Sequence, residues 1–192
     1  MPSRLAQGLQ ALTNIGSRSR CGWETCNYYA MATEQVRIED LDYSAILWRE
    51  DGEWNSIPVP AQHSIVLDDL LALCKQYPGE GGVYAAVGVG EEFFILLRND
   101  NQKTEVVISD GAALLDWDIA EDAADLIDLD WEEGDFEEFE AVGDLHLLSN
   151  FGLKSQDLSM ICDNPDLEPD QQISEIFKRI GAEFAWQKIR NQ

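Results

Sequence analysis

The sequence predicts an α+β fold: a mainly antiparallel sheet of about five strands with one packed helix, then an acidic linker and a C-terminal cluster of about four helices. Three observations support this prediction. Short apolar runs separated by turn-forming residues occupy positions 43–109, carboxylates dominate positions 116–144, and apolar residues recur at helical spacing near the C-terminus. Because the connections between the apolar runs are short, neighbouring strands are expected to be antiparallel.

The N-terminal residues differ from the rest in composition. The first 30 contain three arginines and a single carboxylate, a net charge of +2, in a chain whose net charge is −24. They lack the continuous apolar core of a secretory signal peptide. Met31 stands where the acidic composition begins. We therefore expect residues 1–40 to be a disordered extension, or to result from a mis-assigned start, with no role in the fold.

Residues 41–115 are expected to form the α+β sheet domain. Residues 43–48 and 54–59 flank a polar turn and predict a hairpin. Pro58 and Pro60 are typical of an edge strand, because proline donates no hydrogen bond to a neighbour.

A helix and three more strands are predicted in the remainder of this domain. Ser64 is a good N-cap for a helix over residues 64–76, in which apolar residues recur at helical spacing. Three further strands are predicted over residues 83–89, 92–97 and 104–109, which are apolar and separated by turn compositions. The helix is expected to cover one face of the sheet.

An acidic segment is predicted over residues 116–141. From Asp116 to Asp144 there are 14 carboxylates and no Lys or Arg, so the stretch repels itself and its centre should be solvated and mobile. Two interpretations remain open: a plain acidic linker, or an arm that docks on a basic partner through charge and aromatic anchors. The candidate partner-binding residues are Asp128, Asp130, Trp131, Glu132, Glu133, Asp135, Phe136, Glu137, Glu138 and Phe139.

Residues 142–192 are expected to form a helical tail that packs on or beside the sheet domain. Apolar residues within 142–148 predict a first helix, and Ser155 can cap a second. The clearest helix spans residues 169–181, where proline suits the first turn and glycine the stop. Residues 184–189 suggest a final docking helix.

No catalytic, cofactor or metal site is predicted. A nucleophile–base pair needs a histidine near Ser or Cys, but His63 stands beside a helix cap and His146 among leucines. Cys21 and Cys26 have an allowed spacing for zinc ligands, yet no second ligand pair completes a site. We therefore expect a protein that is not an enzyme.

The charge balance restricts the classes of partner. With 37 Asp and Glu against 13 Lys and Arg, the chain is expected to bind neither nucleic acid directly nor anionic membranes. The longest apolar runs are of strand length, too short to span a membrane as a helix. Four cysteines are few for this length, and a reducing cytoplasm is the expected location.

Several sequence blocks follow an order that is typical of one family. They comprise Trp48 and Trp54 in the first hairpin, the apolar blocks 83–87, 93–98 and 106–110, the acidic insert, residues 143–145, and residues 158–162 in the helical tail. In these blocks, over about three-quarters of its length, the chain resembles the tRNA adenosine deaminase-associated protein family of actinobacteria.

This resemblance implies an association with the deaminase rather than deaminase activity. Base deaminases of that class hold zinc through an H-x-E motif and a Pro-Cys-x-x-Cys motif. Here Ser64-Ile65 follows His63, Leu147-Leu148 follows His146, and Pro-Cys-x-x-Cys is absent. The chain is therefore not expected to be a deaminase itself.

The leading hypothesis is a non-catalytic acidic protein that binds or regulates the tRNA adenosine deaminase or another basic RNA-handling protein. Carboxylates of residues 116–144 would occupy the basic surface on which tRNA lies. The alternative is a small-molecule-binding or sensor domain of unknown ligand, in which the sheet and the helix over residues 64–76 form a pocket with the helical tail as its lid. An undetected hydrolase would require His63 or His146 in a cleft beside a carboxylate.

Overall fold

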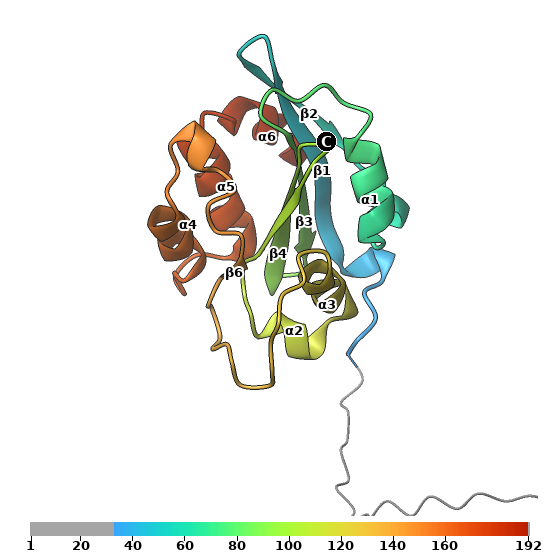
Figure 1. Ribbon diagram of the computed structural model, residues 1–192, viewed down its shortest axis with the longest axis vertical. Helices are drawn as coiled ribbons and strands as arrows, with labels where there is room; N and C mark the ends of the chain where they lie inside the picture. The colour runs from blue at the N-terminus through green and yellow to red at the C-terminus, as the bar shows by residue number, and fades with distance from the viewer. Residues whose placement is uncertain (1–32, 192) are drawn as a thin grey trace, which may run out of the picture. The chain divides into compact units, whose positions relative to one another are not determined.

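The computed structural model describes residues 33–191, so residues 1–32 of the expected extension lie outside it. Its centre is a six-stranded sheet of order β2-β1-β3-β4-β5-β6 in which all neighbours are antiparallel (Figure 1). The strands are β1 (Leu41–Glu50), β2 (Glu53–Pro58), β3 (Val83–Val89), β4 (Phe93–Asn99), β5 (Thr104–Ile108) and β6 (Val142–Gly143). The predicted α+β class with an antiparallel sheet is confirmed, with one strand more than expected.

Helices cover both faces of the sheet (Figure 1). One face carries α1 (Leu67–Cys74), α2 (Ala113–Asp116) and α3 (Asp118–Asp125), and the other carries α4 (Ser155–Cys162), α5 (Pro169–Arg179) and α6 (Glu183–Arg190). Among residues 33–191, no helix has the length and hydrophobicity needed to cross a membrane.

The two helical layers explain the apolar character of the central strands. In β3 and β4 the odd-numbered residues, such as Val87 and Ile95, pack toward α1–α3, while the even-numbered residues, such as Tyr84 and Leu96, pack toward α4–α6. Successive side chains of a strand point to opposite faces. A strand buried on both faces is therefore apolar throughout, which is the pattern that marked these runs in the sequence.

The β1–β2 hairpin follows from a two-residue turn. Asp51 and Gly52 have φ angles of 52° and 79°, as a type I′ turn requires, and Asp-Gly is a preferred pair for it. β2 is the edge strand that Pro58 and Pro60 indicated.

Residues 33–40 pack against α3 and its N-terminal turn, although the sequence placed them in the extension. Val36 is buried in the core, and its amide donates a hydrogen bond to the Asp118 carboxylate at 2.9 Å. The amide of Glu34 donates to the carbonyl of Asp116 at 2.6 Å. These residues therefore contribute to the structure of the described part.

Two local predictions are wrong. Ser64 does not cap α1, which begins three residues later at Leu67. The 3-10 turn Ala61–His63 precedes it, and the buried Ser64 hydroxyl instead donates to the Ser44 hydroxyl at 2.7 Å. The region 113–125, expected as a short apolar turn and the start of the acidic linker, forms α2 and α3, because Ile119, Ala120, Ala123 and Ala124 bury one helical face.

The start of the C-terminal tail also differs. Residues 142–148 form β6 and a turn rather than a helix, and the tail contains the short 3-10 helix Ser149–Phe151 followed by the three α-helices α4–α6. The cause is Gly143, which has φ +101°, and a Cβ added there would lie 2.3 Å from the carbonyl oxygen of Val106. A residue with a side chain would not fit this close approach, so glycine allows residue 143 to pair with Val107 of β5.

Candidate functional site

The carboxylate-rich stretch begins at the last residue of α2 and continues on α3 and on the connection of residues 126–141 that leads from α3 to β6 (Figure 1). Eleven of its carboxylates are exposed, and we call them the acidic face: Asp116, Asp122, Asp125, Asp128, Asp130, Glu132, Glu133, Asp135, Glu137, Glu138 and Glu140. All seven carboxylates predicted as partner-binding residues belong to this face.

The three predicted aromatic anchors have different surroundings. Trp131 and Phe136 are half-buried and pack against the core beneath α1–α3. Phe136 lies over Gly111, where an added Cβ would be 2.6 Å from the Cβ of Phe136. Only Phe139 of the three is exposed, at 46%. The first two aromatic side chains therefore hold the connection against the protein, and Phe139 alone is presented outward.

Backbone hydrogen bonds fix the shape of this connection. Its C-terminal end is tied to the turn after β5, because the amide of Gly111 donates to the carbonyl of Glu140 at 2.7 Å. Within it, the amide of Glu132 donates to the Asp135 carboxylate at 2.8 Å, and the amide of Glu137 to the Glu140 carboxylate at 3.1 Å. The carboxylates thus project from a loop with defined contacts.

The acidic face is not neutralised within residues 33–191. Ion pairs between described residues reach only one carboxylate of the stretch 116–144, Asp144, which lies outside the face as defined. Burial, and then repulsion from Asp118, Asp125 and Asp68, raises the pKa of Asp122. A cationic partner would relieve this repulsion, which gives the face its electrostatic preference.

A small cleft separates α1 from α3 beside this face. It has a volume of about 240 Å³ and is lined by Val66, Leu67, Asp68, Asp122, Asp125 and Leu126. The sequence-based alternative expected a ligand pocket formed by the sheet and α1 with the helical tail as its lid, but the tail helices α4–α6 pack on the opposite face of the sheet. The inner side of α1 instead packs on the sheet through buried leucines, so the space lies between the two helices.

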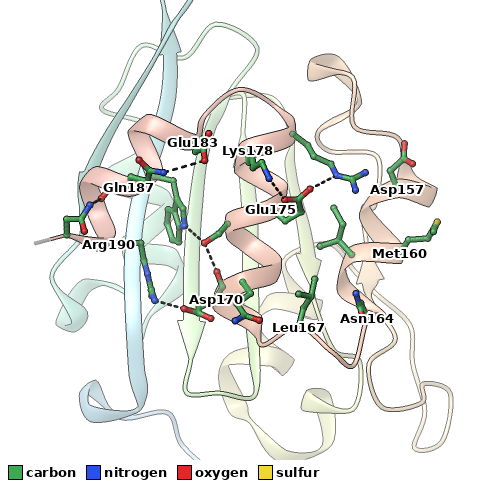
Figure 2. A pocket seen from close by; sticks show the side chains of 16 residues that line it. Asp157, Met160, Asn164, Leu167, Asp170, Glu175, Lys178, Glu183, Gln187 and Arg190 are labelled. Carbon is green, nitrogen blue, oxygen red and sulfur yellow. Dashed lines mark hydrogen bonds and ion pairs between the residues drawn. The ribbon is translucent and has the colours of Figure 1, made fainter.

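A larger groove lies on the opposite helical layer, between α4, α5 and α6 (Figure 2). Its volume is about 960 Å³, and Met160, which is 73% exposed, lines it. Its cations are paired internally: Glu175 accepts from Lys178 and Arg179, both at 3.1 Å, and Asp170 accepts from Arg190 at 2.5 Å. All three cations of the groove are therefore paired with its own carboxylates, which number four.

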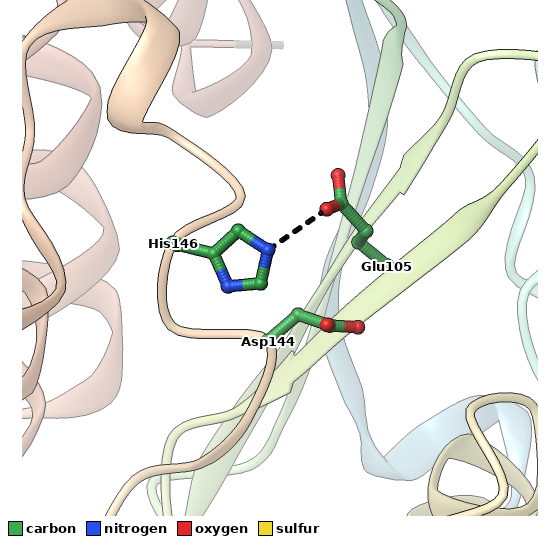
Figure 3. Close-up of side chains that lie close together, drawn as sticks. All are labelled: Glu105, Asp144 and His146. Atoms are coloured by element: carbon green, nitrogen blue, oxygen red, sulfur yellow. Dashed lines mark ion pairs between the residues drawn. The ribbon is translucent and has the colours of Figure 1, made fainter.

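A polar cluster that the sequence did not predict lies at β5 and the turn after β6 (Figure 3). Glu105 is buried and contacts Arg98, Lys103 and His146. Asp144 contacts the same Lys103 at 3.1 Å, and this hydrogen bond raises the pKa of Lys103.

Of the two histidines, one meets part of the condition for a hydrolase. His146 lies beside a carboxylate, with its Nε2 atom 3.3 Å from Glu105 Oε1, and its side chain is 60% exposed. His63 is exposed on the 3-10 turn before α1. The buried thiols of Cys74 and Cys162 lie elsewhere, and burial raises the pKa of each to about 12, which disfavours the nucleophilic thiolate.

Residues 42–183 match the family described as Rv3753c-like tRNA adenosine deaminase-associated protein. The chain belongs to this family. A relative from Mycobacterium tuberculosis, Protein Rv3753c, is 32% identical over 135 residues, which cover 69% of this chain and 78% of the relative. The resemblance inferred from the order of the sequence blocks is therefore confirmed. No solved structure matches the chain.

The family match includes the sheet from residue 42 onward and helices α1–α5, whereas residues 33–41 and all of α6 after Glu183 lie outside it. It covers the acidic face, the Glu105 cluster and most of the groove. The family is named for association with the tRNA adenosine deaminase, and its name calls its members associated proteins.

Proposed function

We propose that this protein is a non-catalytic cytoplasmic partner of the tRNA adenosine deaminase, or of another basic RNA-handling protein, and that it binds through the acidic face. In this proposal the carboxylates of α3 and of residues 126–141 occupy the basic surface on which tRNA lies. Binding of the protein and binding of tRNA are then mutually exclusive.

The observation that carries the proposal is the concentration of exposed carboxylates without internal cations. Eleven of the thirteen carboxylates from Asp116 to Glu140 are exposed, and no ion pair among residues 33–191 involves these eleven. A surface that binds nucleic acid must itself be basic, since it neutralises phosphates. A row of carboxylates held on a defined loop is complementary to such a surface.

The packing of the connection adds to the proposal. Because Trp131 and Phe136 anchor the loop to the core, less conformational entropy is lost when it binds than for a free arm. Exposed Phe139 offers an apolar contact next to Glu137, Glu138 and Glu140. An aromatic side chain surrounded by polar residues is a common arrangement at protein interfaces.

The test is calorimetric titration of the full chain into the tRNA adenosine deaminase of its own organism, at low and at physiological salt. The variant replaces Glu132, Glu133, Glu137 and Glu138 by Gln, and all four are exposed. The control replaces four exposed glutamates outside the face by Gln: Glu50, Glu53, Glu91 and Glu183. Both variants lose the same charge.

We expect saturable binding by the wild type and the control, weaker binding by the variant, and a loss of affinity with salt, because exposed charges are screened beyond about 8 Å at physiological ionic strength. Equal weakening in the two variants would mean that net charge alone acts, and the acidic face would not be the contact. If the protein does not bind the deaminase at low salt or at physiological salt, the partnership with the deaminase itself would be contradicted.

A further inference from the structure

Three donor atoms of different residues converge on one point at the edge of the sheet. They come from Glu105 on β5, Asp144 directly after β6 and His146 in the following turn, and one ligand atom of each lies within 4.8 Å of those of the other two (Figure 3). Glu105 Oε1 and His146 Nε2 are 3.3 Å apart. One imidazole and two carboxylates are ligand types that Zn²⁺ accepts.

We propose that Glu105, Asp144 and His146 form a Zn²⁺ site in which the ion replaces the ammonium group of Lys103. In a tetrahedral site with bonds of about 2.0–2.1 Å, neighbouring ligand atoms are separated by about 3.3–3.4 Å. The distance between Glu105 Oε1 and His146 Nε2 already has this value.

The two carboxylates already bind a cationic group, the ammonium group of Lys103. The Nζ atom of Lys103 lies 3.3 Å from Glu105 Oε1 and 3.1 Å from Asp144 Oδ1, so a positive charge already bridges the two carboxylates. The Lys103 side chain is 55% exposed. It can therefore rotate into solvent, still protonated, when a metal ion takes its place.

The remaining atoms of both carboxylates are held by other groups. Glu105 Oε2 is paired with Arg98, and Asp144 Oδ2 accepts a hydrogen bond from the amide of Val106 at 3.2 Å. Such contacts orient metal ligands and are typical of metal sites. The other oxygen of each carboxylate therefore faces the ammonium group of Lys103, which the metal ion would replace.

The exposure of the site and the number of its protein ligands are also compatible with zinc. His146 is 60% exposed and can turn its ring with little cost, whereas Glu105 is 6% exposed and rigid. Three protein ligands leave the fourth tetrahedral position to water. The bound ion would link β5 to the turn that precedes the helical tail.

The test measures Zn²⁺ binding to the untagged full chain by calorimetry in excess Mg²⁺, which saturates weak sites on the acidic face. Cys21 and Cys26 are replaced by Ser throughout, because thiols are zinc ligands. The variants are His146→Ala and Lys103→Met, and His63→Ala is the matched control, since His63 is also an exposed histidine. Thermal unfolding without metal verifies that each variant folds.

We expect one Zn²⁺ per chain, binding at least tenfold weaker in His146→Ala and unchanged binding in His63→Ala. Lys103→Met should bind about five- to tenfold tighter, because no exposed ion pair has to be broken. Co²⁺ should show the visible absorption of a tetrahedral site in the wild type and lose it in His146→Ala. Zinc affinity that is the same in His146→Ala and the parent, or lower in Lys103→Met, would overturn the proposal.

Discussion

Replacement of Gly143 by Ala tests the account of β6, which brings Asp144 and His146 beside β5. Gly143 has φ +101°, and an added Cβ would lie 2.3 Å from the carbonyl oxygen of Val106. A residue other than glycine held in such a backbone conformation lowers the stability of the folded state by about 1–3 kcal/mol. The contact with a backbone oxygen adds to this cost, since it forces the β5–β6 pair apart.

Gly134→Ala is the matched control for this substitution. Gly134 has a similar φ of +92°, but nothing lies within 4 Å of its added Cβ. Gly134→Ala should therefore lower the free energy of unfolding only through the unfavourable backbone conformation, by about 1–2 kcal/mol. For Gly143→Ala we expect a loss in the free energy of unfolding of about 3–4 kcal/mol, the upper range for a single substitution with a named steric cause.

Urea denaturation followed by circular dichroism measures both variants. With an m-value of about 2 kcal/mol/M, the midpoint should fall by about 1.5–2 M for Gly143→Ala and by less than about 1 M for Gly134→Ala. Equal shifts in the two variants would refute the steric argument, because both have a positive φ but only the Cβ added at Gly143 meets other atoms, chiefly the carbonyl oxygen of Val106.

Three further predictions follow from the same structure. Phe136→Ala should lower the free energy of unfolding by about 1–2 kcal/mol and speed amide hydrogen exchange in residues 126–141, because the half-buried ring holds this connection; unchanged exchange there would contradict the anchoring. Burial raises the pKa of Asp110, so its stabilising contribution is present below the pKa of the unfolded chain and is lost as pH rises through the folded pKa. The free energy of unfolding of Asp110→Asn, measured relative to the wild type by urea denaturation, should therefore be higher at pH 7 than at pH 3. The opposite order would contradict this prediction. The thiols of Cys74 and Cys162, whose pKa burial raises to about 12, should not react with a thiol reagent at neutral pH until urea unfolds the chain, in a variant without the two N-terminal cysteines; rapid native labelling would contradict their burial.

The central strands and the helix α5 were predictable because their signals are local. In β3 and β4 apolar residues occupy nearly every position, whereas a strand with one face in solvent alternates apolar and polar residues. Such continuous runs are typical of a sheet covered on both faces. Pro169 at the first turn and the buried positions Ile173, Ile176 and Phe177 define α5 without reference to the rest of the chain. Such features depend on residues that are close in sequence.

β6 and the Glu105 cluster were not predictable for the opposite reason. β6 is two residues long, and Val142 pairs with Ile108 across an insertion of more than thirty positions. Glu105 and His146 meet only because this pairing places the turn after β6 beside β5. Asp144 and His146 are close in sequence, but Glu105 comes from a distant strand, so the sequence does not indicate that the three residues meet.

The acidic stretch was predictable in charge but not in shape. Its carboxylates are exposed as their composition indicated, whereas Trp131 and Phe136 contact the protein's own core. Apolar residues in a charged segment pack on whatever apolar surface is near, and the sequence does not reveal that surface. This placement leaves Phe139 as the exposed aromatic residue among the predicted anchors.

The most direct test of the central claim is displacement of tRNA from the tRNA adenosine deaminase by this protein. Fluorescence anisotropy of labelled tRNA, bound to the deaminase, is followed as the full chain is added at physiological salt. The account predicts that the wild type and the control with Glu50, Glu53, Glu91 and Glu183 replaced lower the anisotropy to that of free tRNA. The variant with Glu132, Glu133, Glu137 and Glu138 replaced should require a much higher concentration. A stable or rising anisotropy with the wild type, showing that tRNA stays bound, would contradict competition through the acidic face.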